Sequence, residues 1–281
     1  MTLQQEYEQL KYQIGQYDAA GDYVGLAREM DRFLELTGQL YGMDSPEYAA
    51  TLNDYGGIHR DIGNYEKAEL AFLQAAEKIA ALQSSQHADY GSVLNNLAGL
   101  YRLMKEYEKS ELYFQKTLEI YKQALGEEHF LYISGLNNLG LLYQDMGRSA
   151  EAEPLHRHSL MMLEAVDNNP IAIATTLNNL ASALRQQKKL DDVAALLERA
   201  LRIYENVLGQ GHSLYAYGLN NLASYYMDLK QYDNAAVYYK SVLNLCETLF
   251  GVESRNYQIS KQNYEIACRL AAEQQGQGGK V

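Results

Sequence analysis

The sequence predicts an all-α protein made of stacked helical hairpins, and three observations support this prediction. A Leu-Asn-Asn or Leu-Asn-Asp motif recurs five times, the steps between its leucines are 42, 42, 41 and 42 residues, and only 3 of the 281 residues are proline. A fixed period of this size is typical of stacked repeats, in which each repeat contacts only its neighbours. The leading leucines are Leu52, Leu94, Leu136, Leu177 and Leu219.

The first helix of each repeat follows from the spacing of its apolar residues. With the leading leucine at position 4, position 7 is Leu in four repeats, position 8 is always Gly or Ala, and position 11 is mostly Tyr. Positions 4, 7, 8 and 11 lie on one face of a helix. The small residue at position 8 lets a second helix approach closely. Position 15 is Gly or Lys, and Gly there suits a left-handed helix end.

A second amphipathic run follows in each repeat, as in residues 107–125, and a short loop such as LGEEHF closes the repeat. The same frame extends to both ends of the chain, which predicts six helical hairpins and a C-terminal capping helix. The predicted repeats are about 10–51, 52–93, 94–135, 136–176, 177–218 and 219–260, the capping helix is 261–270, and 271–281 is a flexible tail.

These residues resemble a known repeat family. The small residue at position 8, Tyr at 11, Gly at 15, Tyr at 17 and Ala at 20 resemble the tetratricopeptide repeat (TPR). The 42-residue length, the LNNLA start and the LGxxH loop resemble its kinesin-light-chain-type subclass. The chain is not expected to be a kinesin light chain, because that protein has a long heptad segment where about ten residues precede the first repeat here. The resemblance implies a single solenoid over residues 1–270, wound as a right-handed superhelix, whose concave groove binds extended peptides.

The asparagine pairs predict how such a groove binds. Position 5 lies on the face opposite the core, and a side-chain amide there offers donors and an acceptor to a peptide backbone. We therefore expect the position 5 residues to contact a ligand: Asn53, Asn95, Asn137, Asn178 and Asn220. Position 6 lies at the edge of the neighbouring repeat, so its asparagines are expected to bridge adjacent hairpins through hydrogen bonds to the backbone: Asn96, Asn138, Asn179 and Asn221.

Arginine is frequent at position 12, and it leaves two interpretations open. Arg60, Arg102 and Arg185 could bind carboxylates of an acidic or C-terminal peptide, because a guanidinium group donates two parallel hydrogen bonds. The alternative is that they pair with acidic residues at position 13, which are Asp61, Asp145 and Asp228. Tyr217 also falls on the groove face, where it could anchor an apolar ligand side chain.

No motif of catalysis, phosphate binding or metal binding is evident. His156 and His158 are two residues apart, so on a helix they point in different directions and do not chelate one metal. His87, His129 and His212 recur in the loop between repeats, which indicates packing or helix capping. His59 is expected to be a partly buried core histidine. We predict no catalytic residues, no metal and no cofactor.

Composition narrows the class of partner. The net charge of −12 argues against nucleic acid and anionic membranes, which both attract basic surfaces. Two cysteines and the lack of an apolar leader predict a reducing, cytoplasmic location. We expect a non-enzymatic scaffold that binds a protein or peptide partner and that could self-associate through its solenoid ends. The alternatives are a sensory module for a small signalling peptide and an enzyme with an unrecognised site.

Overall fold

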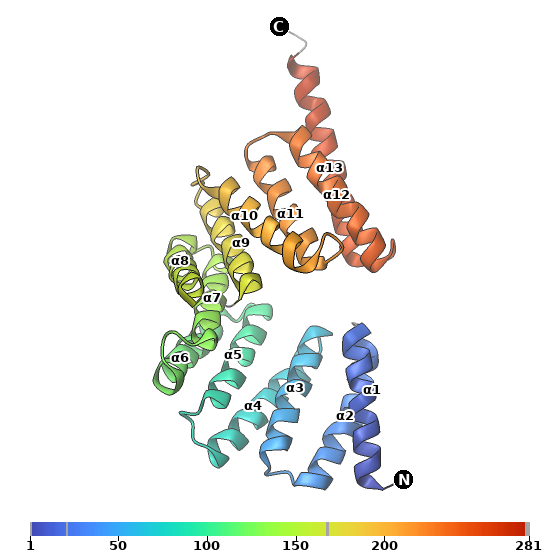
Figure 1. The fold of residues 1–281 in the computed structure, drawn as a ribbon, viewed down its shortest axis with the longest axis vertical. Helices are drawn as coiled ribbons and strands as arrows, with labels where there is room; N and C mark the ends of the chain where they lie inside the picture. The colour runs from blue at the N-terminus through green and yellow to red at the C-terminus, as the bar shows by residue number, and fades with distance from the viewer. Residues whose placement is uncertain (1, 21, 167–168, 279–281) are drawn as a thin grey trace. The chain divides into compact units, whose positions relative to one another are not determined.

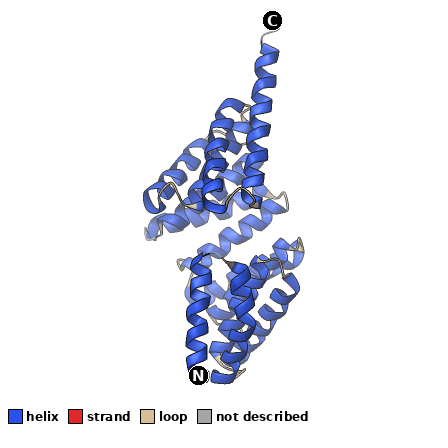
Figure 2. Ribbon diagram, turned by 90° about the vertical axis from the view of Figure 1, so that its right-hand side faces the viewer, coloured by secondary structure: helices blue, strands red, loops and turns tan. Residues whose placement is uncertain are grey.

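The computed structural model describes residues 2–20, 22–166 and 169–278, and within them the chain forms thirteen helices and no strand (Figure 1, Figure 2). The helices are α1 (Leu3–Ala20), α2 (Tyr23–Tyr41), α3 (Pro46–Asp61), α4 (Tyr65–Leu82), α5 (Ala88–Leu103), α6 (Tyr107–Leu125), α7 (Phe130–Asp145), α8 (Ser149–Val166), α9 (Pro170–Gln186), α10 (Val193–Leu208), α11 (Ser213–Asp228), α12 (Tyr232–Phe250) and α13 (Arg255–Gly278). This succession of helices without strands confirms the predicted all-α repeat fold.

The helices belong to two compact units, Met1–Leu142 and Tyr143–Val281. The division falls within α7. In the N-terminal unit each helix from α1 to α6 contacts the next, and in the C-terminal unit the same holds from α8 to α13. The first helices of adjacent repeats also touch directly, α3 with α5 and α9 with α11. The predicted groove face is therefore formed by neighbouring first helices within a unit.

The predicted core positions are buried. All five leading leucines are at most 6 % exposed, and the small residue at position 8 is buried in each of the same repeats. A Cβ added to Gly56 would be only 2.7 Å from the Phe72 ring, so the close approach of α3 and α4 depends on this glycine. The residue equivalent to Phe72 is also buried in the other repeats, where it is Phe114, His156, Leu197 or Tyr239.

The turn between the two helices of a hairpin has the predicted left-handed conformation. Gly63 and Gly147 have φ angles of 84° and 74° at position 15. Lys105, Lys188 and Lys230 adopt the same conformation, with φ between 57° and 62°, although a side chain in this region costs about 1–2 kcal/mol. The turn is therefore imposed by the packing of the two helices, and glycine only makes it easier.

The loop histidines cap the first helix of the next hairpin, as the sequence indicated. The Nδ1 atoms of His87, His129 and His212 each accept a hydrogen bond from the backbone N–H two residues later, at 3.1–3.2 Å. Each bond satisfies one of the unpaired N–H groups at the start of a helix.

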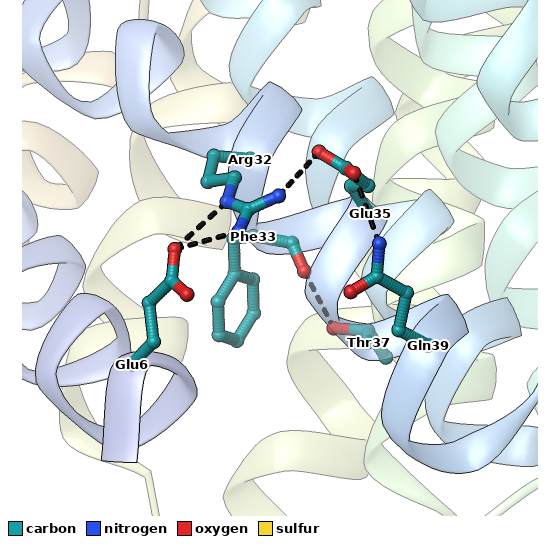
Figure 3. Close-up of polar contacts among 6 residues, drawn as sticks. All are labelled: Glu6, Arg32, Phe33, Glu35, Thr37 and Gln39. Carbon is teal, nitrogen blue, oxygen red and sulfur yellow. Dashed lines mark hydrogen bonds and ion pairs between the residues drawn. The ribbon is translucent and has the colours of Figure 1, made fainter. Parts of the chain in front are cut away.

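A charged cluster fastens α1 to α2 at the start of the chain (Figure 3). The Nε and Nη2 atoms of Arg32 on α2 both donate to Oε1 of Glu6 on α1, at 2.9 and 2.7 Å. The Nη1 atom donates to Glu35, and Gln39 donates to the other oxygen of Glu35. The stacked rings of Tyr7 and Phe33, whose centroids are 4.9 Å apart, supply the apolar part of the same contact.

The helix boundaries differ from those predicted. The first helices begin about one and a half turns before the leading leucine, as α3 does at Pro46, because the apolar spacing marks the buried face and not the cap. Likewise α13 begins at Arg255 and extends to Gly278, beyond the predicted capping helix 261–270. Residues 271–275 are Ala, Glu and Gln, which favour helix.

Candidate functional site

Asparagines of adjacent repeats are hydrogen-bonded to each other in the N-terminal unit. The Nδ2 of Asn96 on α5 donates to Oδ1 of Asn53 on α3 at 2.9 Å. One repeat further, Nδ2 of Asn138 donates to Oδ1 of Asn95 at 3.0 Å. The position 6 asparagine therefore bridges two hairpins, but it bonds to the position 5 side chain and not to the backbone as expected. The two members of the motif are partners across the repeat boundary.

Each bridge leaves polar atoms available on the groove face. Asn53 and Asn96 are both half-buried, and neither the Nδ2 of Asn53 nor the Oδ1 of Asn96 has another hydrogen-bond partner within the described ranges. The Asn95–Asn138 bridge leaves the same two kinds of atom. An unbonded amide donor and an unbonded amide acceptor are the groups with which the C=O and N–H of an extended peptide can form hydrogen bonds.

The C-terminal unit contains the same bridge, but there the Nδ2 of the position 5 asparagine is hydrogen-bonded as well. Asn221 donates to Oδ1 of Asn178 at 2.8 Å, and Asn178 uses its own Nδ2 toward Ala174 O at 3.1 Å and the Tyr204 hydroxyl at 3.4 Å. Asn178 is fully buried. The expectation that Asn178 contacts a ligand is therefore wrong, because every polar atom of its side chain is engaged inside the unit.

The other residues predicted for the groove and for the repeat boundary differ in how exposed they are. Asn137 and Asn220 are half-buried, and Tyr217 is 41 % exposed. Asn179 is buried, and its backbone carbonyl accepts a hydrogen bond from Gln144 at 3.3 Å.

Two of the three position 12 arginines pair with carboxylates at position 13. The Nε of Arg60 is 2.8 Å from Oδ1 of its neighbour Asp61. The Nε of Arg185 is 2.7 Å from Oδ2 of Asp228 in the next repeat, and both side chains are less than a quarter exposed. The second interpretation of these arginines therefore holds at Arg60 and Arg185, and their charge is neutralised within the protein. Arg102 is half-buried beside the amide pairs.

Two adjoining hollows lie on the groove face of the N-terminal unit. The first, which we call the amide hollow, has a volume of about 180 Å³ and is lined by Arg60, Asn95, Asn96, Gly99, Arg102, Leu103, Phe114 and Asn138. The second, which we call the α1–α3 cleft, has a volume of about 550 Å³. It is lined from α1, α2 and α3, and by Asn96 of α5. Because Arg60 and Asn96 line both, the two hollows form one continuous surface.

Glycines line both hollows at the same repeat position. Gly57 and Gly99 are at position 9, in the interior of α3 and α5, and a Cβ added to either would have no atom within 4 Å. Alanine would favour these helices by roughly 0.5–1 kcal/mol at such a site. Packing therefore gives no reason for glycine here, and its absence of a side chain keeps the hollows open. The recurrence of Gly15, Gly57 and Gly99 was visible in the sequence but was not interpreted.

Two further features are absent from the described residues. No group of three or more His, Cys, Asp or Glu side chains is arranged to hold a metal ion in the parts of the chain that the structure covers. Among the helices described, none has the length and apolar character needed to cross a bilayer.

Comparison with known proteins places the repeats in a family. The family model for the tetratricopeptide repeat matches residues 89–165 and 172–248. No curated protein matches the chain. The fold is similar to that of BtubC (BKLC) from P. vanneervenii, at 18 % identity and a TM-score of 0.65, over 82 % of this chain and 92 % of that one.

Two other solved structures share the fold at low identity. A kinesin-light-chain-type protein with nearly identical TPR-like repeats from Podosopora anserina is 18 % identical, with a TM-score of 0.60 over 74 % of this chain and 99 % of that one. A Rap protein complexed with competence and sporulation factor is 15 % identical, with a TM-score of 0.64 over 98 % of this chain and 78 % of that one.

Proposed function

The chain belongs to the tetratricopeptide repeat family, and on that premise we propose that it is a non-enzymatic scaffold whose N-terminal unit binds an extended peptide segment of a partner protein. The observation that supports this most directly is the pair of amide bridges with unused atoms. Asn53 and Asn95 each present an unbonded Nδ2 toward the groove while their Oδ1 atoms are held by the next repeat. The bridges fix the amide orientations before a ligand arrives, which lowers the entropy lost on binding.

The open glycine positions support the same proposal. A peptide backbone can bond to the amides only if it approaches the helices closely, and Gly57 and Gly99 leave that space free. The amide groups contact backbone atoms, so the affinity from this part of the groove would depend little on ligand sequence. The residues lining the α1–α3 cleft would then set the preference.

The proposal can be tested by removing the donors without breaking the bridges. In Asn95→Asp the Oδ1 acceptor for Asn138 is kept, but the Nδ2 donor is lost. The probe is a displayed library of random 12-residue peptides, selected on the parent protein and resynthesised for affinity measurement. We expect selected peptides to bind Asn95→Asp at least tenfold more weakly. The control Gln74→Glu adds the same charge at an exposed position of α4 and should bind like the parent.

Two results would contradict the proposal. One is a selection that enriches no peptide on the parent protein. The other is a set of selected peptides that bind Asn95→Asp as tightly as the parent, since the amide donors would then have no part in binding.

A second candidate function is a module that responds to a small signalling peptide. The observation in its favour is the fold shared with the Rap protein complexed with competence and sporulation factor, over 98 % of this chain. The two functions differ in their consequences. A responsive module should change its radius of gyration when a selected peptide binds, as measured by small-angle X-ray scattering, whereas a scaffold should bind without that change.

A further inference from the structure

No asparagine bridge joins the first two repeats, and a cleft lies between their first helices instead. Lys11 and Tyr12 of α1 occupy the positions where later repeats have an asparagine pair. In α3 the position 6 residue is Asp54, so the bridge that joins α3 to α5 has no counterpart between α1 and α3. The α1–α3 cleft lies between these two helices, and its volume of about 550 Å³ is within the range of about 300–1,000 Å³ usual for ligand pockets.

The floor of the cleft is apolar. Leu26 and Met30 of α2 line it and are each 2 % exposed, and Ile14, Phe33 and Ile58 complete its apolar lining. Gly57 on the α3 side and Gly15 on the α1 side add no side chain to its walls, and a Cβ at either would meet nothing within 4 Å. The cleft can therefore accept a bulky apolar side chain from outside.

Asp54 lies in the same cleft without a partner. No hydrogen bond or ion pair engages its carboxylate among the residues that the structure describes, although Arg60 close by is paired with Asp61. The carboxylate is open to solvent but has protein on several sides, and this desolvation raises the pKa of Asp54. Lys11 also lines the cleft, but it is exposed and lies more than 4 Å from the carboxylate, so its ammonium group can remain hydrated at the rim.

We infer that the α1–α3 cleft binds a bulky apolar side chain of the peptide ligand with an adjacent cationic group, a Lys or Arg, held by Asp54. This inference rests on the proposed peptide-binding function and specifies its ligand. It also reverses the acidic preference expected from the sequence, because Arg60 is already neutralised while Asp54 is not. The net charge of −12 on the protein also favours a ligand with a cationic group.

The test uses fluorescein-labelled decapeptides of Gly and Ser with a central pair of residues, Phe-Lys, Phe-Gln, Phe-Glu or Gly-Lys, measured by fluorescence anisotropy. On the parent protein Phe-Lys should bind at least tenfold more tightly than Phe-Glu, and more tightly than Gly-Lys. Asp54→Asn restores the asparagine that other repeats have at this position, so it should fold normally. It should weaken Phe-Lys at least fivefold and leave Phe-Gln unchanged.

Three further variants locate the contact. Glu66→Gln removes the same charge from an exposed, unpaired position on α4 and should have no effect. Gly57→Leu fills the cleft from an open helical position, so it should abolish Phe-Lys binding while its melting temperature equals or exceeds that of the parent. Lys11→Gln should bind Phe-Lys as tightly as the parent or more tightly. A loss of affinity in Lys11→Gln would assign the contact to the lysine and overturn the inference.

The outcomes separate this inference from the proposed function. The inference is overturned if Phe-Lys does not bind the parent up to 1 mM, if Phe-Glu binds as tightly, or if Asp54→Asn has no effect on Phe-Lys. In those cases, the proposed function would still be supported if library-selected peptides bind Asn95→Asp or Gly99→Leu more weakly than they bind the parent. If no library peptide binds, both fail.

Discussion

The N-terminal and C-terminal units contain the same asparagine bridge but differ in what it leaves exposed. In the N-terminal unit the Nδ2 groups of Asn53 and Asn95 remain unbonded, and glycines keep the surface beside them open. In the C-terminal unit Asn178 bonds to Tyr204 and is fully buried. The same motif therefore leaves amide atoms unbonded in one unit and engages all those of Asn178, at position 5, in the other.

The residue at position 9, beside the amides, also differs between the two units. Position 9 is Gly in the first three repeats and Ser in the last two, where it is Ser182 or Ser224. Ser224 donates to Asn220 O at 2.9 Å and lies 3.1 Å from the Tyr239 hydroxyl. The C-terminal unit thus carries serine side chains at the position where the N-terminal unit has glycine. The following predictions test this contrast, from the largest expected effect to the smallest.

The largest effect should come from acidification of the C-terminal unit. His156 occupies a core position that is Phe in two other repeats, and its burial lowers its pKa to about 4. Its neutral form is therefore favoured by folding, so the stabilisation is complete above the unfolded pKa of about 6.5 and is lost as pH falls from there. The loss should reach about 2 kcal/mol at pH 5 and about 3 kcal/mol at pH 4.

This pH effect can be measured by urea unfolding at pH 7 and pH 5, a range in which most ordinary carboxylates remain ionised. His156→Phe should remove most of the difference between the two pH values. His59→Phe, at a buried histidine of the N-terminal unit whose pKa is lowered as well, should remove a smaller part. Equal pH dependence in the parent and His156→Phe would show that His156 does not control acid stability.

Breaking the asparagine bridge should reduce the free energy of unfolding more in the C-terminal unit than in the N-terminal unit. Asn221→Ala leaves the buried Oδ1 of Asn178 without a donor, which should cost about 1–3 kcal/mol. Asn96→Ala exposes the Oδ1 of the half-buried Asn53 to water, so the loss should be nearer 0.5–1.5 kcal/mol, about the net value of one hydrogen bond. Native-state hydrogen exchange of α9 and α3 measures the two effects separately, and a larger loss in Asn96→Ala would contradict the contrast.

A smaller difference in stability is expected when two tyrosines at the same repeat position are each replaced by phenylalanine. Tyr204→Phe removes the hydroxyl that lies 3.1 Å from Thr175 and also accepts from Asn178, whereas Tyr121→Phe removes one bond to Ser92. At about 1 kcal/mol for each bond, Tyr204→Phe should be the more destabilising by about that amount. It should also increase hydrogen exchange in α9, and unchanged exchange there would indicate that Tyr204 does not hold Asn178 inward.

The smallest effects should come from the paired arginines. Arg185→Gln breaks a partly buried pair that joins two repeats, and thermal unfolding should show a loss of about 1 kcal/mol or less. Arg60→Gln breaks a more exposed pair between sequence neighbours, for which we expect about 0–0.5 kcal/mol. If Arg60→Gln instead weakened the binding of selected peptides more than tenfold, the guanidinium would have a role in the groove despite its pairing.

Much of the fold followed from the sequence because a repeat constrains it many times over. The leucines at position 4, the small residues at position 8 and the left-handed turn at position 15 were all visible as periodic patterns. The division into two units was not, since the one change in spacing, the 41-residue step after Leu136, does not by itself indicate a break within α7. Helix starts were also displaced, because capping residues such as Ser45 and His87 vary while the apolar spacing does not.

The site was predicted only in part, because partners in a repeat protein lie one repeat apart in sequence. The face that carries Asn53 and Asn95 could be assigned from helix geometry alone. That each accepts a hydrogen bond from a residue 43 positions later could not. The pairing of Arg185 with Asp228, also 43 residues away, was one of two open alternatives.

The sequence by itself determined the repeat, the all-α fold and the helix face that carries the position 5 asparagines, because these depend on spacing along single helices. The tertiary structure decided which polar groups remain available. Whether an amide or a carboxylate is satisfied depends on the distance and orientation of groups on neighbouring helices, which composition does not specify. For that reason Asn178 and Asn95, identical in the motif, differ in availability, and the structure alone shows that Asp54 has no partner among the described residues.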